Sequence, residues 1–154
     1  MGRGEGFFEG GRISPEYAVF LSYSREDEGA LTGTFNGIRS RGIPVFQDKK
    51  AIPGGANWPD VLYRSVRNCQ VFLCMLSPQS AGSISVLIEV ALARHAHRPI
   101  VPVLLQAVAL PSAMRALLEG TQHIDLSGRV DSKEGLDELL NALAVYGLCP
   151  QRQR

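Results

Sequence analysis

Three apolar runs without alternation constrain the fold more than any other feature of the sequence. They lie at residues 18–21, 71–76 and 100–105. A strand with one solvated face alternates apolar and polar residues, whereas a strand covered on both faces of a parallel sheet is apolar throughout. The runs therefore predict buried parallel strands, and such strands need helices on both sides of the sheet.

Strand and helix patterns alternate five times along the chain. We expect strands at residues 17–22, 43–46, 71–76, 100–105 and 123–126. The first helix should begin near Ser24, where Ser24 and Asp27 have the spacing of a capping box, and the others should span residues 58–67, 83–97, 111–118 and 133–145. Connections of this length allow only parallel pairing, so the sequence predicts a flavodoxin-like, doubly wound α/β domain with strand order 2-1-3-4-5.

One domain accounts for nearly the whole chain, because 154 residues suffice for one core and not for two. We expect that domain at residues 17–146. Residues 1–16 hold five glycines and are expected to form a flexible arm, and residues 147–154 a disordered tail. No segment has the length of a membrane span, and residues 1–11 lack the apolar core of a signal peptide. We therefore expect a cytoplasmic protein without a membrane partner.

Charge and motifs exclude several function classes. The net charge of +1 does not favour nucleic acid as the main partner. Neither a P-loop nor a dinucleotide-binding glycine motif follows the first expected strand. His95 and His97 stand two residues apart, so they do not share a helix face, and we expect no metal site. Cys69, Cys74 and Cys149 lack C-x-x-C spacing and are expected to be reduced thiols.

The helix expected at residues 83–97 carries one carboxylate, Glu89, among apolar and small residues. At about 100° per residue, the side chains expected to face the core are Ile84, Leu87, Ile88 and Ala91. Glu89 lies on the opposite stripe, so the spacing predicts that it points away from the core. A solvated helix face is the common interpretation of such a position. A site or an interface is the alternative, because the residues around this carboxylate are small or apolar.

The expected strand order points to one edge of the sheet as the place for a ligand. In an order of 2-1-3-4-5, ligands enter between strands one and three at their carboxyl ends. These ends are residues 22–25 and 76–79, and the helix with Glu89 follows the third strand. Arg25 and Asp48 lie on loops at this edge, where surface charge is the common interpretation and ligand binding the alternative. Trp58 is expected to anchor its loop, with ligand contact as the alternative.

Successive blocks of the sequence resemble those of a Toll/interleukin-1 receptor (TIR) domain. The blocks are VFLSYS at 19–24, GIPVFQD at 42–48, IPGGANW at 52–58, VFLCMLSP at 71–78, Glu89, and IVPVL at 100–104. The match spans residues 17–145. The chain looks most like bacterial and other NAD-cleaving TIR domains, because its Pro-Gly loop and the Trp-led helix after it are similar to theirs.

This resemblance implies cleavage of the bond between nicotinamide and ribose in NAD⁺, with NAD⁺ as the substrate and no resident cofactor. Glu89 takes the position of the family's catalytic carboxylate. Tyr23, Ser24 and Arg25 would line the cleft at the end of the first strand. The loop 48–58, which begins at Asp48 and ends at Trp58, would form a movable wall of that cleft.

Ser85 marks a departure from the family pattern. Many NAD-cleaving relatives have Trp four residues before the catalytic Glu, at the position of Ser85 in this chain. Trp there would stack on the substrate, so its absence bears on substrate affinity. Active TIR enzymes are similar in building a site between two subunits, and a neighbouring copy would supply the missing wall. The resemblance thus implies self-association, or docking with other TIR domains, through the loop 48–58 and the helix of Glu89.

Three hypotheses follow from the sequence. The leading one is an NAD⁺ hydrolase that is activated by self-assembly and acts as an immune or virulence effector. The alternative is a non-enzymatic TIR adaptor that signals by homotypic docking through the loop 48–58. Nucleotide or nucleic-acid processing, of the kind some plant relatives show, is the third and has the least support from the composition.

Overall fold

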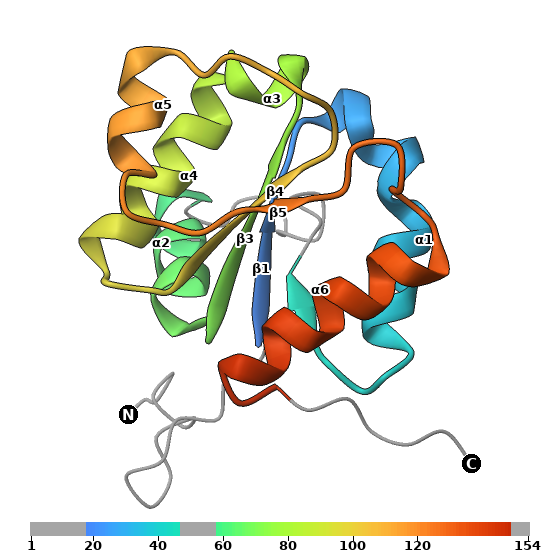
Figure 1. Cartoon of the computed structure of the whole chain (residues 1–154). Coiled ribbons are helices and arrows are strands. Elements are labelled where there is room, and N and C mark those ends of the chain that lie inside the picture. The colour runs from blue at the N-terminus through green and yellow to red at the C-terminus, as the bar shows by residue number, and fades with distance from the viewer. Residues whose placement is uncertain (1–17, 47–57, 149–154) are drawn as a thin grey trace, which may run out of the picture.

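The computed structural model describes residues 18–46 and 58–148, which form a sheet of five parallel strands between two layers of helices (Figure 1). The order along the sheet is β2-β1-β3-β4-β5, as predicted. The strands are β1 (Val19–Ser22), β2 (Val45–Phe46), β3 (Val71–Leu76), β4 (Ile100–Leu104) and β5 (Ile124–Asp125). The continuous apolar runs of β1 and β3 are buried along their whole length, because helices cover both of their faces.

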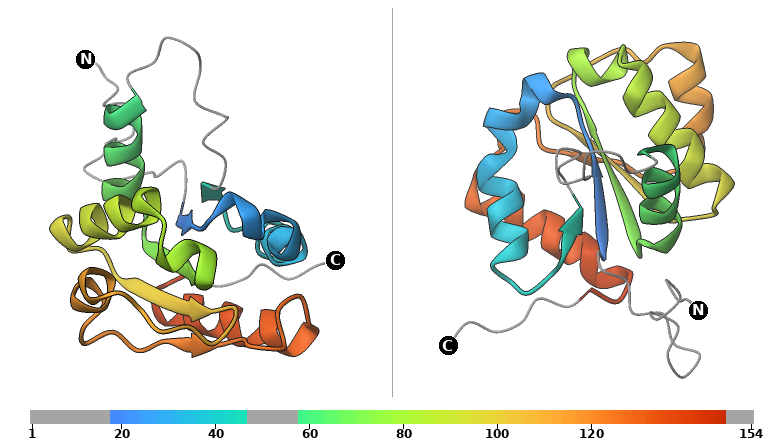
Figure 2. Two further views of the ribbon diagram at one scale, coloured as in Figure 1. Left: turned by 90° about the horizontal axis from the view of Figure 1, so that it is seen from above. Right: turned by 180° about the vertical axis from the view of Figure 1, so that it is seen from behind.

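Helices α1 and α6 pack on one face of the sheet, and α2, α4 and α5 pack on the other (Figure 1, Figure 2). The helices are α1 (Glu28–Arg39), α2 (Trp58–Asn68), α3 (Pro78–Ala81), α4 (Ile84–His95), α5 (Ser112–Leu117) and α6 (Lys133–Val145), and a 3₁₀ turn, η2 (Arg25–Asp27), precedes α1. The short α3 was not predicted. It forms because Ser77 and Ser80 make a capping box around Pro78, which favours the first turn of a helix.

A row of aromatic rings crosses three neighbouring strands on the α4 side of the sheet. Phe20 of β1 pairs in register with Phe46 of β2 and Phe72 of β3. The ring centroids lie 5.1 Å and 5.2 Å apart, and both pairs are stacked. Because side chains alternate along a strand, Ser22 and Cys74 lie on the same face, one step nearer the carboxyl edge. The row therefore forms a rigid apolar floor that ends at Ser22 and Cys74.

The end of the folded domain lies beyond the expected boundary at residue 146. Leu148 is buried in the core next to α6, and its backbone N–H donates to the carbonyl of Leu143 at 3.1 Å. The expected tail thus begins too early, because an apolar side chain after the helix adds to the core. The expected arm at residues 1–16 and the end of the tail, 149–154, lie outside the described residues. Within the described part of the chain, no helix has the length and apolar character needed to cross a membrane.

Glycines in α1 give a test of how closely α1 packs against α6. A Cβ at Gly29 would meet no heavy atom within 4 Å, whereas a Cβ at Gly37 would lie 2.6 Å from Cδ2 of Leu136. We expect Gly29→Ala to raise the free energy of unfolding by about 0.5–1 kcal/mol, because alanine restricts the unfolded chain and favours the helix. Gly37→Ala should give no gain, since Leu136 must move. Urea unfolding measures both variants, and equal gains would contradict the close packing.

Candidate active site

Glu89 is buried beside the carboxyl end of β1. Among residues 18–46 and 58–148, it is the one acidic or basic residue in the buried class, with 1% of its surface exposed. The hydroxyl of Ser22 donates a hydrogen bond to Glu89 Oε1 at 2.6 Å. That distance lies at the short end of the range for hydrogen bonds between two oxygens. The pair joins α4 to the last residue of β1.

The sequence prediction for the inward face of α4 was wrong. The residues of α4 that are buried are Val86, Glu89, Val90 and Ala93. Ile84 and Ile88, which were expected in the core, are 73% and 47% exposed. The helix has two apolar stripes with the same spacing, so periodicity alone does not choose between them. The stripe with smaller side chains faces the sheet, and this choice allows α4 to lie close to the aromatic row.

The surroundings of Glu89 are apolar, and the raised pKa of the nearby Cys74 thiol is a consequence of the same burial. Burial, and secondarily the nearby charge of Glu89, raise the pKa of Cys74 to about 12. The thiol therefore stays protonated at neutral pH and does not act as a nucleophile. Burial likewise raises the pKa of Cys69 to about 12. Both cysteines are free and buried, as predicted, and Cys149 lies outside the described residues.

The position of Glu89 is unfavourable for stability alone. Removal of a charged carboxylate from water costs several kcal/mol, and an apolar side chain of similar size would avoid that cost. Val86 and Val90, its buried neighbours on α4, show that apolar residues fit this face. The location of Glu89 beside the switch point of a parallel sheet, where ligands bind in such folds, makes it a candidate functional group.

A second hydrogen bond crosses the same edge of the sheet. Ser77, directly after β3, donates from its hydroxyl to Asp27 Oδ2 at 2.5 Å. Asp27 was expected to form a capping box with Ser24. Instead, Ser24 caps the 3₁₀ turn by accepting from the backbone N–H of Glu26 at 3.3 Å, and Ser77 binds the carboxylate of Asp27. The turns after β1 and β3 are thereby tied together on either side of the switch point.

The predicted cleft residues after β1 have different surroundings from Glu89. Tyr23 packs its ring on Phe35 of α1, with 5.2 Å between centroids, on the face of the sheet opposite α4. Ser24 is the N-cap of η2, and Arg25 is exposed in that turn. Their roles in substrate binding stay predictions.

The remaining predicted binding residues belong to α4 and to the loop before α2. Ser85 is exposed in the first turn of α4, one turn before Glu89. Helix α2 begins at Trp58, but the side chain of Trp58 and all of residues 47–57, including Asp48, lie outside the described part of the chain. The predicted movable wall therefore also stays a prediction.

Sequence reasoning missed Ser22 as a site residue. Its signal was available in the alternation of β1, since Ser22 shares a face with Phe20 and is the first polar residue of that face. The expectation that Glu89 points away from the sheet removed any reason to pair the two. The predicted switch point and the inward face of α4, taken together, would have found the contact.

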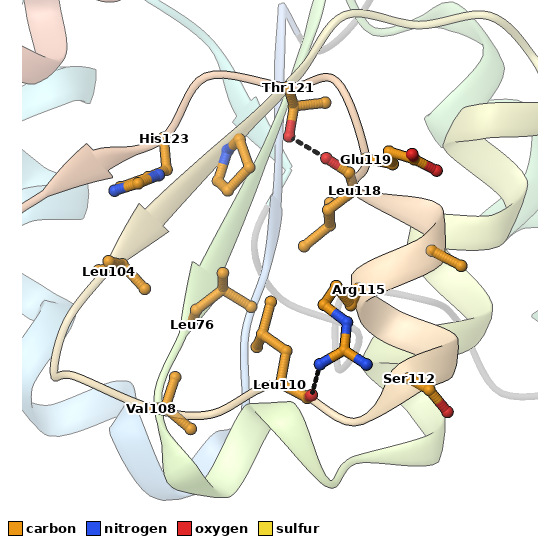
Figure 3. A pocket seen from close by; sticks show the side chains of 12 residues that line it. Leu76, Leu104, Val108, Leu110, Ser112, Arg115, Leu118, Glu119, Thr121 and His123 are labelled. Carbon is orange, nitrogen blue, oxygen red and sulfur yellow. Dashed lines mark hydrogen bonds between the residues drawn. The ribbon is translucent and has the colours of Figure 1, made fainter.

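A separate pocket lies between α5 and the ends of β3 and β4 (Figure 3). Its volume is about 700 Å³, and most of the side chains that line it are apolar. At its rim, the hydroxyl of Thr121 donates to the carbonyl of Leu118 at 2.6 Å, and Arg115 donates to the carbonyl of Leu110 at 3.4 Å. Glu89 does not line this pocket, so the pocket and the carboxylate site are distinct.

Solved structures with a similar fold include TIR domains. The TIR domain of the Toll-related receptor TRR-2 from Hydra magnipapillata has a TM-score of 0.69 and 16% identity, over 86% of this chain and 99% of that one. The TIR domains of the activated Roq1 resistosome, which recognizes the pathogen effector XopQ, have a TM-score of 0.65 and 20% identity, over 82% and 99%. At these identities the likeness shows the fold alone.

An enzyme structure also shares the fold. The CMP N-glycosidase BcmB from Clostridium botulinum has a TM-score of 0.54 and 17% identity, over 79% of this chain and 96% of that one. A comparison with curated proteins found no match.

A family model places the chain more firmly than these structures do. The model for the TIR domain matches residues 19–140, which include every strand of the sheet and Glu89. With the strand order and the fold, this match shows that the chain belongs to the TIR domain family.

Proposed function

We propose that this TIR domain cleaves NAD⁺ between nicotinamide and ribose and releases ADP-ribose or a cyclic variant of it. The proposal includes activation by self-assembly and a role as an immune or virulence effector. The observation that carries it is the buried carboxylate of Glu89, which Ser22 holds at 2.6 Å beside the switch point of the sheet.

The chemistry of NAD⁺ cleavage needs one carboxylate rather than two. Nicotinamide leaves as a neutral molecule, so no general acid is required. The ribose becomes positively charged in the transition state, like the sugar in glycoside hydrolysis, until water attacks the anomeric carbon. A negative group held near that sugar stabilises the developing charge, and it does so more strongly in apolar surroundings than in water. Glu89 supplies the carboxyl group, and its surroundings are apolar.

Family membership supports an N-glycosidic reaction without establishing the substrate. NAD-cleaving enzymes occur in the TIR family, to which this chain belongs. In the proposal, Glu89 takes the role of their catalytic carboxylate, as the resemblance of the sequence blocks implies. The fold of the CMP N-glycosidase is also similar to that of this chain. That enzyme acts on a bond between a base and a ribose, which is the kind of bond that joins nicotinamide to ribose in NAD⁺.

A non-enzymatic adaptor is the second candidate, and the outer face of α4 favours it. Ile84 and Ile88 are one turn apart on that face and are the exposed large apolar residues of α4. Adjacent apolar side chains exposed on a helix are typical of a protein contact. TIR domains associate with one another, so a second TIR domain is the partner that fits. An adaptor would need this surface and not Glu89, whereas the proposed enzyme needs both.

Removal of the carboxylate tests the proposed reaction. We expect the purified wild-type domain at high concentration to release nicotinamide from NAD⁺, and Glu89→Gln and Glu89→Ala to lower the rate at least about 100-fold. Glu134→Gln, in the exposed first turn of α6, is the matched control and should keep the wild-type rate. Chromatography of released nicotinamide measures the rates. A wild type that is inactive even as a forced oligomer would refute the enzyme hypothesis.

The stability of the Ser22–Glu89 pair gives a second test, independent of any substrate. We expect Ser22→Ala to lower the free energy of unfolding by about 1–3 kcal/mol, because a buried carboxylate loses the hydrogen bond from the Ser22 hydroxyl. The double variant Ser22→Ala/Glu89→Met should be at least as stable as the wild type, since both polar groups are replaced by apolar ones of similar shape. Urea unfolding measures both. A double variant less stable than Ser22→Ala would mean that the pair serves the fold.

Substitutions on the outer face of α4 test the role of assembly. We expect Ile84→Asp and Ile88→Asp to weaken self-association at least about tenfold, because burial of one isoleucine contributes about 1.5–3 kcal/mol. Specific activity should then stop rising with protein concentration. Val145→Asp, on α6, is the matched control, because Val145 is 78% exposed and belongs to another surface. Sedimentation equilibrium measures association, and unchanged association in the α4 variants would exclude this face.

A further inference from the structure

We propose that Ser22 is a positioning residue that sets the orientation of the Glu89 carboxylate for the reaction. The proposal rests on the proposed function, because it assigns Ser22 a task only if Glu89 acts on a substrate. It starts from one contact, the hydrogen bond of 2.6 Å from the Ser22 hydroxyl to Glu89 Oε1. Both residues are buried, with 0% and 1% of their surfaces exposed.

Ser22 has the rigidity that a positioning residue needs. It is the last residue of β1 and pairs in register with Cys74 of β3. Its side chain has one rotatable bond before the hydroxyl oxygen, so a fixed backbone limits that oxygen to a few staggered positions, and the bond to Glu89 uses one of them. Phe20, two residues earlier on the same face, is held between Phe46 and Phe72. The sheet and its aromatic row therefore limit where the hydroxyl oxygen lies.

Glu89 has the freedom that makes positioning useful. Its side chain has three rotatable bonds, and a fixed hydrogen bond to one oxygen removes much of that freedom. The neighbouring side chains of Val86 and Val90 have no donor, and the thiol of Cys74 is a weak one. Ser22 donates a hydrogen bond to Oε1 at 2.6 Å, and this bond restricts the carboxylate.

Orientation of the carboxylate bears on the rate more than on substrate binding. A misplacement of about 1 Å at a reacting group can cost about 100-fold in rate. NAD⁺ is a large molecule, and contacts far from the scissile bond would hold it in place. Loss of the Ser22 hydroxyl should therefore lower kcat and leave KM almost unchanged. A purely structural serine would change neither once the protein is folded.

The experiment measures kcat and KM for NAD⁺ in the whole chain. We expect Ser22→Ala to lower kcat about 10- to 100-fold with less than about a threefold change in KM, and Ser22→Thr, which keeps the hydroxyl, to recover most of the loss. Thr34→Val is the matched control, because it removes a buried hydroxyl from α1, on the other side of the sheet, and should keep the wild-type kcat. A kcat of Ser22→Ala equal to that of the wild type would overturn the proposal.

A double-mutant comparison tests whether Ser22 acts through Glu89. It compares the effect of Ser22→Ala in the wild type with its effect in Glu89→Gln, and so distinguishes a positioning role from unfolding and from a wrong proposed function. If Ser22 acts through Glu89, Ser22→Ala should lower the residual rate of Glu89→Gln by less than about twofold. A full 10- to 100-fold further loss would show that Ser22 acts by another route and would overturn the proposal. An active wild type with an inactive Glu89→Gln and a fully active Ser22→Ala refutes the positioning role alone. An inactive wild type refutes both proposals together.

Discussion

The packing of α4 on the aromatic row is the contact on which the candidate site depends. Phe46, Phe20 and Phe72 form a continuous floor across β2, β1 and β3, and the buried stripe of α4 lies over the same face. Helix and sheet are close enough there for a side chain of α4 to reach the end of β1. Glu89 makes that contact through Ser22. Without the close packing, the carboxylate would extend into solvent and its orientation would not be fixed.

At Glu89, the residue that would suit the proposed function differs from the residue that would give the most stable fold. The rest of the inward stripe of α4 is valine and alanine, which suits an apolar interface. Glu89 interrupts it with a carboxylate, and the hydrogen bond from Ser22 offsets part of the cost of burial. Proteins keep such local violations mainly at functional sites, where a carboxylate in apolar surroundings acts more strongly on a nearby positive charge than it would in water.

The strands and their parallel pairing could be predicted from the sequence because the features that indicate them lie in short, continuous segments. Continuous apolar runs identified β1 and β3, connection lengths favoured parallel pairing, and the flavodoxin-like fold that fits five such strands supplied the order that the structure confirms. The inward face of α4 could not be predicted in the same way, because both apolar stripes have helical spacing. That choice depends on how closely the helix approaches the sheet, which involves residues of β1 and β3 that are distant in sequence. The Ser22–Glu89 bond joins residues 67 positions apart and shares this difficulty.

The two faces of α4 carry the candidate site and the proposed assembly surface. The inner stripe includes the carboxylate of Glu89, and the outer stripe exposes Ile84 and Ile88 less than two turns away. A helix of 12 residues moves as a rigid element, so a contact on its outer stripe and the position of the carboxylate on its inner stripe are mechanically linked. Ser22 opposes any such movement, because it fixes the carboxylate to the sheet. Under the proposed function, assembly would therefore act by adding the neighbouring wall of the site and not by displacing Glu89.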